Sequence, residues 1–97
     1  MTRRMYRYIV PLDDHAHTFE LTSDPVHVAA PADRIHEVEF WAEHDPDAPT
    51  VTRAFRVFGT GQPLPDHARW VGTCDRTPLG LVWHLYEWAQ AEVRADG

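Results

Sequence analysis

Two short segments of the sequence carry residue types that could bind a ligand. The segment 13–17, Asp-Asp-His-Ala-His, places two carboxylates beside His15 and His17, which would share one face of an extended chain. Zinc prefers three or four such ligands, so His27 or His36 would have to complete the set. A solvated polar loop between strands explains the same residues, and we expect no metal and no cofactor.

The second segment is a Gly-Thr-Gly run at residues 59–61, which follows an alternating stretch and precedes prolines at 63 and 65. Its successive backbone N–H groups could form an anion-binding nest, with Arg56 or Arg69 adding positive charge. The prolines forbid the helix that a Walker loop or a dinucleotide fingerprint requires. The simpler interpretations are a corner in which a glycine takes a positive φ, or a contact surface for a partner protein.

A third candidate is His84, within the apolar run 81–88. A histidine on a strand is commonly a hydrogen-bonded core or interface group, and a catalytic base would need a nucleophile close by. Ser23 is the only serine and Cys74 the only cysteine, and neither stands beside a histidine in the sequence. We therefore predict no catalytic residues, and an enzyme remains only the third hypothesis.

The chain has four tryptophans, at positions 41, 70, 83 and 88, which is more than one thin core can hide. At least one of them should face outward. Alternation puts Trp41 on a face with glutamates, where Arg56 could stack on it in a cation–π contact. The functional interpretation is that Trp41 or Trp88 anchors a partner, because tryptophan and arginine dominate binding hot spots.

The elements that must position these residues are strands. Residues 35–44 alternate, with Val38, Phe40 and Ala42 on one face, and residues 51–59 alternate less strictly. Six or seven short strands separated by Pro and Gly turns predict a mainly β fold, a small antiparallel β-sandwich or partly closed barrel, in one domain over 1–97. The other expected strands are 5–10, 17–22, 26–30, 68–74 and 81–88.

The prolines and aspartates of residues 44–50 predict a hairpin that joins the two alternating runs. Such a hairpin would place Glu37 or Glu39 opposite Arg53 or Arg56. The run 81–88 is apolar on both faces, which is typical of a central strand. Good helix formers fill only 87–95, so the last residues, 88–97, are expected to form a short helix or a frayed tail.

Composition narrows the function classes. The 97 residues carry a net charge of -6, which disfavours binding to nucleic acid or to an anionic membrane. Lysine and asparagine are absent, as expected for a GC-rich bacterial or bacteriophage genome. The apolar run near the start is interrupted by Arg7 and too short for a signal peptide or a membrane span, and a single cysteine allows no internal disulfide. We expect a cytoplasmic protein.

The stretch 40–87 resembles a family of small proteins from actinobacteriophages and actinobacterial genomes. The likeness lies in the order of an Asp-Pro-Asp-Ala turn, Gly-Thr-Gly-x-Pro-Leu-Pro, Val-Gly-Thr and a closing Val-Trp-His-Leu-Tyr-Glu. It implies a phage or prophage origin but transfers no chemistry.

We therefore expect a noncatalytic interaction or accessory module that binds a host or phage protein in the host cytoplasm and could form a homodimer. The alternative is a small-ligand binder that holds a nucleotide-like or anionic molecule at the glycine bend. The candidate ligand- or partner-binding residues are Trp41, Arg56, Gly59, Thr60, Gly61, His84 and Trp88.

Overall fold

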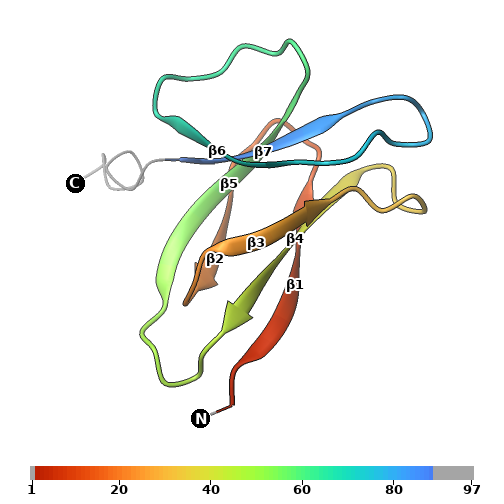
Figure 1. The fold of residues 1–97 in the computed structure, drawn as a ribbon. Helices are drawn as coiled ribbons and strands as arrows, with labels where there is room; N and C mark the ends of the chain where they lie inside the picture. The colour runs from red at the N-terminus through yellow and green to blue at the C-terminus, as the bar shows by residue number, and fades with distance from the viewer. Residues whose placement is uncertain (1, 89–97) are drawn as a thin grey trace.

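The structure of the protein is a computed structural model that describes residues 2–88. Within that range the chain forms seven strands and no helix, arranged in two antiparallel sheets (Figure 1). Sheet A has the strand order β1-β4-β3 and sheet B the order β2-β5-β7-β6. The strands are β1 (Arg4–Pro11), β2 (His17–Leu21), β3 (Pro25–Ala29), β4 (Glu37–His44), β5 (Val51–Gly59), β6 (Ala68–Thr73) and β7 (Trp83–Trp88).

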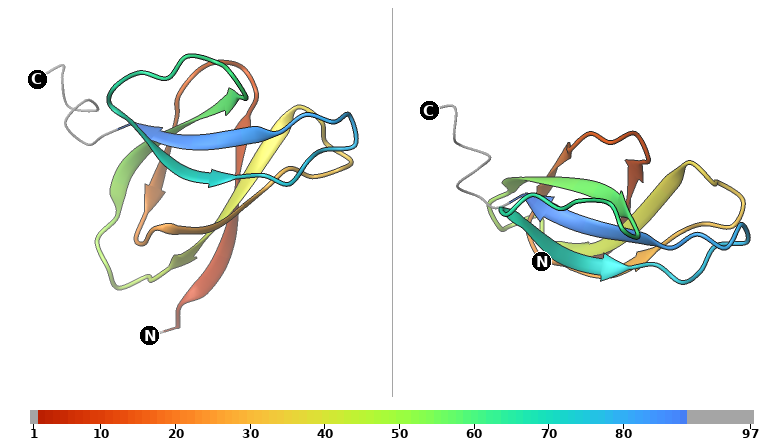
Figure 2. Two further views of the ribbon diagram at one scale, coloured as in Figure 1. Left: turned by 45° about the horizontal axis from the view of Figure 1, so that its top comes forward. Right: turned by 90° about the horizontal axis from the view of Figure 1, so that it is seen from above.

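The two sheets stack as a sandwich and do not close into a barrel (Figure 2). The predicted mainly β sandwich is confirmed. The central place of the run 81–88 is also confirmed, because β7 pairs with β5 on one side and with β6 on the other. The helix predicted for 87–95 is wrong at its start, since Glu87 and Trp88 complete β7, and residues 89–97 lie outside the described part of the chain.

The hairpin predicted between β4 and β5 is wrong, because the two strands lie in different sheets. The end of β4 is tied instead to the turn before β3: the Ser23 hydroxyl donates to the Glu43 carbonyl at 2.6 Å, and the Asp45 N–H donates to Thr22 Oγ1 at 2.9 Å. Residues 45–50 therefore cross between sheets. Alternation determines which face of each strand is buried but not which strand becomes its neighbour.

The arginine partners differ accordingly from those predicted. Glu39 lies 3.3 Å from Arg7 across sheet A, whereas Arg53 pairs with Glu87 and Asp24 in and beside sheet B. Neither Glu37 nor Glu39 faces Arg53 or Arg56.

The core between the sheets follows the predicted alternation of β4. Val38, Phe40 and Ala42 are completely buried, while the residues between them are only partly covered. Phe40 is the centre of an aromatic cluster that joins the sheets: its ring lies 4.9 Å from Phe55 and 5.4 Å from Phe19, both of sheet B. Burial of these rings is a main source of the stability of the domain.

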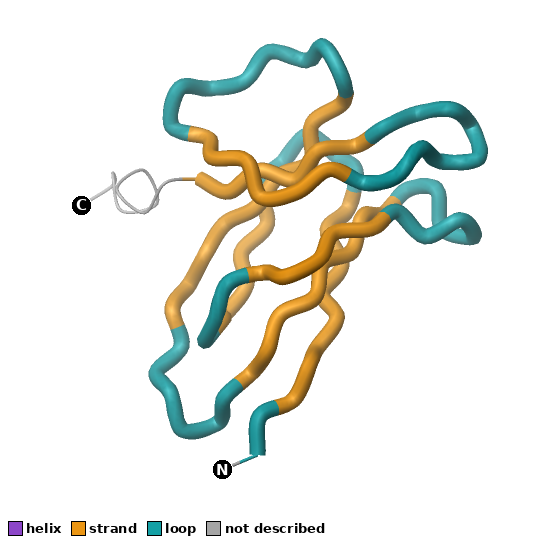
Figure 3. Tube along the Cα trace, in the orientation of Figure 1, coloured by secondary structure: helices purple, strands orange, loops and turns teal. Residues whose placement is uncertain are grey.

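A second apolar cluster lies on the outer face of sheet B. Strands β5 and β6 both run antiparallel to β7, so they are parallel to each other, and the 60–67 loop that joins them must travel along β7 (Figure 3). Phe58, which is almost fully buried, packs against Tyr86 and Trp88 at ring distances of 5.4 and 6.0 Å. His67, at the end of the loop, contacts the Trp88 ring. The prolines at positions 63 and 65 lie within this loop.

One carboxylate is buried at the end of the sandwich. Glu87 is 6% exposed and accepts two hydrogen bonds from Arg53, from Nε at 2.7 Å and from the terminal NH2 group at 2.8 Å. The other terminal nitrogen of Arg53 lies 2.8 Å from the exposed Asp24 carboxylate. The hydrogen bond to Glu87 raises the pKa of Arg53 against the opposing effect of burial. The pair is thus a fixed ionic link between β5 and β7.

Candidate functional site

The Gly-Thr-Gly bend turns a corner, as the simpler interpretation predicts. The Gln62 N–H donates to the Gly59 carbonyl at 3.1 Å, and the Gly59 N–H donates in return to the Gln62 side-chain oxygen at 3.0 Å. Gly61 has a φ of 89°, which only glycine adopts without strain. The Gly59 N–H, which an anion-binding nest would need, is therefore already used within the bend. Residues 59–61 of the bend do not line the groove between β3 and β6 or the cavities that adjoin it.

Arg56 and Trp41 do not meet, so the cation–π contact predicted between them is wrong. Trp41 lies on the outer face of sheet A, in register with Arg7 and His27, where its neighbours cover part of it. The Arg56 guanidinium lies 4.5 Å above the Phe58 ring in sheet B. Arg56 thus covers the outer apolar cluster.

The histidines of the 13–17 segment form a local contact. His17 Nε2 lies 2.8 Å from Asp13 Oδ1, and the hydrogen bond with His17 lowers the pKa of the Asp13 carboxyl. His15 contributes its backbone N–H to the same carboxylate at 3.1 Å. Across residues 2–88, no group of three or more histidine, cysteine, aspartate or glutamate side chains is placed to hold a metal ion, and His27 and His36 do not complete one.

Cys74 has the environment of a core residue. Its thiol is buried within the inter-sheet core. Burial, followed in effect by the charges of Asp75 and Glu39, raises the pKa of the thiol to about 11. The side chain therefore stays protonated at neutral pH, which is the unreactive form of cysteine.

His84 belongs to a continuous chain of hydrogen bonds across the outer face of sheet B. Trp70 Nε1 donates to Thr73 Oγ1 at 2.9 Å, and Thr73 Oγ1 lies 3.0 Å from His84 Nδ1. His84 Nε2 lies 2.9 Å from Thr60 Oγ1, which reaches the Val82 carbonyl at 3.4 Å. The chain brings together two predicted site residues, Thr60 and His84, with two that were not predicted.

A bulge in β6 makes this chain geometrically feasible. On a regular strand Trp70 and Thr73 would point to opposite faces of the sheet. The register shifts between Trp70 and Gly72, so that Trp70 lies opposite Tyr86 and Thr73 lies opposite His84. The extra residue therefore returns Thr73 to the outer face on which Trp70 lies.

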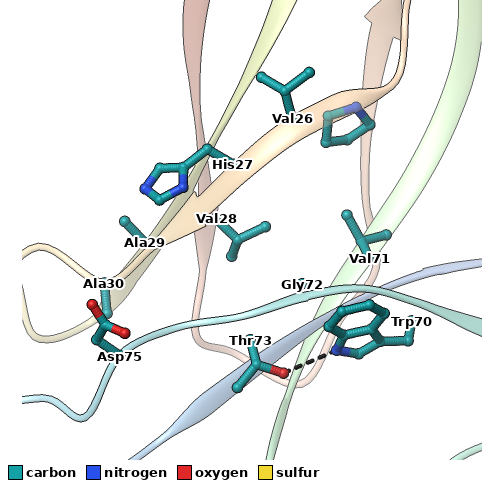
Figure 4. Close-up of a pocket in the computed structure, with 11 residues that line it drawn as sticks. Val26, His27, Val28, Ala29, Ala30, Trp70, Val71, Gly72, Thr73 and Asp75 are labelled. Carbon is teal, nitrogen blue, oxygen red and sulfur yellow. Dashed lines mark hydrogen bonds between the residues drawn. The ribbon is translucent and has the colours of Figure 1, made fainter.

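A groove lies between β3 and β6, which are edge strands of the two sheets. Figure 4 shows the side chains along it. The groove has a volume of about 410 Å³ and is lined by both strands, with Val26 at 64% exposure and Trp70 at 62%. Each edge strand pairs on one side only, β3 with β4 and β6 with β7, so part of its backbone faces the groove.

The groove continues onto two loops, 30–36 after β3 and 74–82 after β6, which lie side by side beyond the strands (Figures 1 and 2). These loops expose Ile35, Leu79 and Leu81, with Leu79 at 65% exposure. We call the groove and the two loops together the seam. Of the nine large apolar side chains that are exposed among residues 2–88, five line the seam, and they are Val26, Ile35, Trp70, Leu79 and Leu81.

The two edge strands pack tightly against each other at Gly72, and this contact yields a prediction. A Cβ atom added to Gly72 would lie 2.6 Å from Val28 Cγ2, so Gly72→Ala should push β6 away from β3. We expect the free energy of unfolding to fall by about 1–3 kcal/mol in urea denaturation. In a Val28→Ala background the same change should cost less, because the colliding Cγ2 methyl group is gone and only the Val28 Cβ, at 3.0 Å, remains close. Equal costs in both backgrounds would contradict this packing.

The prediction that at least one tryptophan faces outward is confirmed, but the exposed one is Trp70. Trp41, Trp83 and Trp88 are each partly covered. The sequence analysis missed Trp70 because exposure on an edge strand depends on sheet order. A usable signal was present in the glycine two residues later, because glycine inside a strand often marks a bulge.

Residues 1–95 match a family model described as a domain of unknown function, DUF7352, which supports the resemblance to a family without an assigned activity. No curated protein and no solved structure matches the chain. Residues 2–88 contain no helix that could cross a membrane. The match extends over nearly the whole length, and the chain therefore belongs to the DUF7352 family.

Proposed function

We propose that the protein is a noncatalytic interaction module whose seam binds an extended polypeptide segment of a partner protein. The observation that carries this proposal is the concentration of exposed apolar side chains along two unpaired strand edges and the loops that continue them. Exposed apolar patches of this kind are typical of protein-binding surfaces. Trp70 would be the anchor, since a large aromatic ring supplies much contact area with few rotatable bonds.

The backbone of the seam favours an extended occupant. Edge strands carry unpaired N–H and C=O groups, which an added strand can satisfy while its alternate side chains enter the groove. Both edges also carry a bulge, between Pro25 and His27 in β3 and between Trp70 and Gly72 in β6. Bulges interrupt pairing, so the bound segment would pair over only about three or four residues between a bulge and the adjoining loop.

The charges of the seam suit a partner of either sign. Although the whole chain carries -6, the ionic side chains that line the seam and the cavity at its Pro25 end balance one another. Selectivity would then come from apolar side chains and backbone pairing, and association should depend only weakly on salt. The balanced groups are Asp24, Asp75 and Glu87 against Arg34, Arg53 and Arg69.

The biological setting of the proposal comes from the resemblance to actinobacteriophage proteins. The partner would be a host or phage protein met in the host cytoplasm, and the module would act as an accessory factor of phage or prophage origin. A second copy of the chain is the competing occupant of the seam, and the experiment below separates the two.

The test is a selection of displayed random 12-residue peptides against the protein. We expect enriched peptides with alternating apolar residues, and Trp70→Ser should weaken their binding at least about thirtyfold. Tyr6→Ser is the matched control, because Tyr6 is an exposed aromatic residue on the other edge strand of sheet A, and it should leave affinity unchanged.

Two outcomes would overturn the proposal. One is that the enriched peptides bind Trp70→Ser as tightly as the unaltered chain. The other is that the protein sediments as a dimer that Trp70→Ser dissociates, which would identify a second copy as the occupant. Thermal unfolding of each variant confirms that it is folded.

A further inference from the structure

We infer that His84 is a positioning residue, which together with Thr60 and Thr73 fixes the indole of Trp70 at the rim of the seam. The inference assigns a role to the Gly-Thr-Gly bend, whose central residue is one end of the hydrogen-bonded chain. Its consequence for binding rests on the function proposed above, whereas its consequence for the Trp70 ring does not.

Each link of the chain has one donor and one acceptor when His84 carries its proton on Nε2. The Trp70 indole can only donate, so Thr73 Oγ1 must accept from it, and the Thr73 hydroxyl is then free to donate to His84 Nδ1. His84 Nε2–H donates to Thr60 Oγ1, whose hydroxyl donates to the Val82 carbonyl. This tautomer follows from the pattern of donors and acceptors, and it gives the chain a single direction.

This chain of hydrogen bonds runs across sheet B, from the end of β5 over β7 to the edge strand β6. Thr60 is placed by a bend that the glycine conformation and the Gln62 contacts hold in shape. Trp70, by contrast, is mostly exposed on an edge strand, with little packing to hold its ring. The hydrogen bond to Thr73 is thus the main restraint on the orientation of the indole.

The same hydrogen bond determines what the ring offers to a partner. The only polar group of the indole already donates to Thr73, so Trp70 offers a partner mainly its apolar ring surface. A ring held in place before binding also loses less rotational freedom when a partner covers it. Loss of this chain of hydrogen bonds should therefore weaken binding through Trp70 about three- to tenfold. Thr60→Val tests this effect alone, because Thr60 does not line the groove, whereas Thr73 does.

The decisive measurement is the rate at which the Trp70 indole N–H exchanges with water, followed by NMR with the signal assigned through Trp70→Phe. Thr73→Val removes the direct acceptor and should speed exchange about two- to tenfold. Thr60→Val should produce a smaller change in the same direction, although Thr60 does not touch Trp70. The conservative variants Thr73→Ser and Thr60→Ser should restore the original rate.

Thr52→Val is the matched control, because Thr52 is an exposed threonine of β5 that bonds Glu20 instead. It should leave the Trp70 signal unchanged. An unchanged Trp70 rate in both Thr73→Val and Thr60→Val would overturn the inference, as would equal acceleration of all four indoles, which would indicate general loosening.

The selected peptides separate this inference from the proposed function. If they bind Thr60→Val and Thr73→Val as tightly as the unaltered chain, positioning by His84 has no role in binding, while the seam stays the binding surface. If the peptides bind Trp70→Ser as tightly as the unaltered protein, the seam proposal fails. The exchange rates of the Trp70 indole N–H still decide whether the chain of hydrogen bonds fixes the ring.

Discussion

Replacing Glu87 with alanine should lower the free energy of unfolding by about 3–5 kcal/mol. Glu87 is buried and holds the mostly buried Arg53 guanidinium through two short hydrogen bonds. Among residues 2–88, alanine would leave that charge with only the exposed Asp24 carboxylate as a close ionic partner. A domain of this size is stable by about 5–15 kcal/mol, so the urea midpoint should fall steeply.

Two further variants make the Glu87 prediction specific. Glu43→Ala removes an exposed ion pair with Arg3 and should cost no more than about 1 kcal/mol. Combining Arg53→Met with Glu87→Leu removes both buried charges and should recover most of the loss. A Glu87→Ala protein as stable as Glu43→Ala would show that the ionic link does not support the fold.

The same ionic network lines a cavity that adjoins the Pro25 end of the seam. Arg53, Arg69 and Glu87 line a cavity of about 270 Å³ that Trp70 also borders. Arg69 lies 3.6 Å from Glu87 and is itself exposed. Loss of Glu87 should therefore disturb the seam as well as the fold, and binding tests should use the variants of Trp70 instead.

Replacing Phe40 with alanine should cost about 3–5 kcal/mol, because it removes the ring at the centre of the sandwich. Phe40 is fully buried and contacts Tyr8 within sheet A as well as Phe19 and Phe55 across the core. Phe40→Leu keeps most of the apolar volume and should cost clearly less. The measurement is urea denaturation of both variants.

Tyr6→Ala is the control for Phe40. Tyr6 is also aromatic and stacks on His44 at 5.3 Å, but it is exposed. Its removal should change stability by less than about 1 kcal/mol. If Phe40→Ala and Tyr6→Ala had similar costs, Phe40 would not be the centre of the core.

The sequence was sufficient to predict the fold class and the faces of the strands, but not the pairing of the strands. The alternation around Phe40 identifies its buried face because the apolar pattern that marks this face lies within a single strand. Pairing depends on neighbours far apart in the sequence, so the short connection 45–50 resembled a hairpin although it crosses between sheets. The hydrogen bond from Ser23 to Glu43, which holds this crossing in place, joins residues 20 positions apart and has no local sequence pattern.

The same limit explains the outcome for the candidate site. Gly61 and the prolines after it are local signals, and the predicted corner is present. His84 was identified, but its partners Thr73 and Thr60 are 11 and 24 residues away. Trp70 is exposed because β6 lies at an edge of sheet B, and no local sequence pattern reveals the order of the strands.

The most direct test of the central claim is amide hydrogen exchange of the protein with and without a selected peptide. The account predicts new protection in β3, β6 and the loops 30–36 and 74–82, and its loss in Trp70→Ser. Protection confined to another surface, such as the exposed edge strand β1, would contradict it.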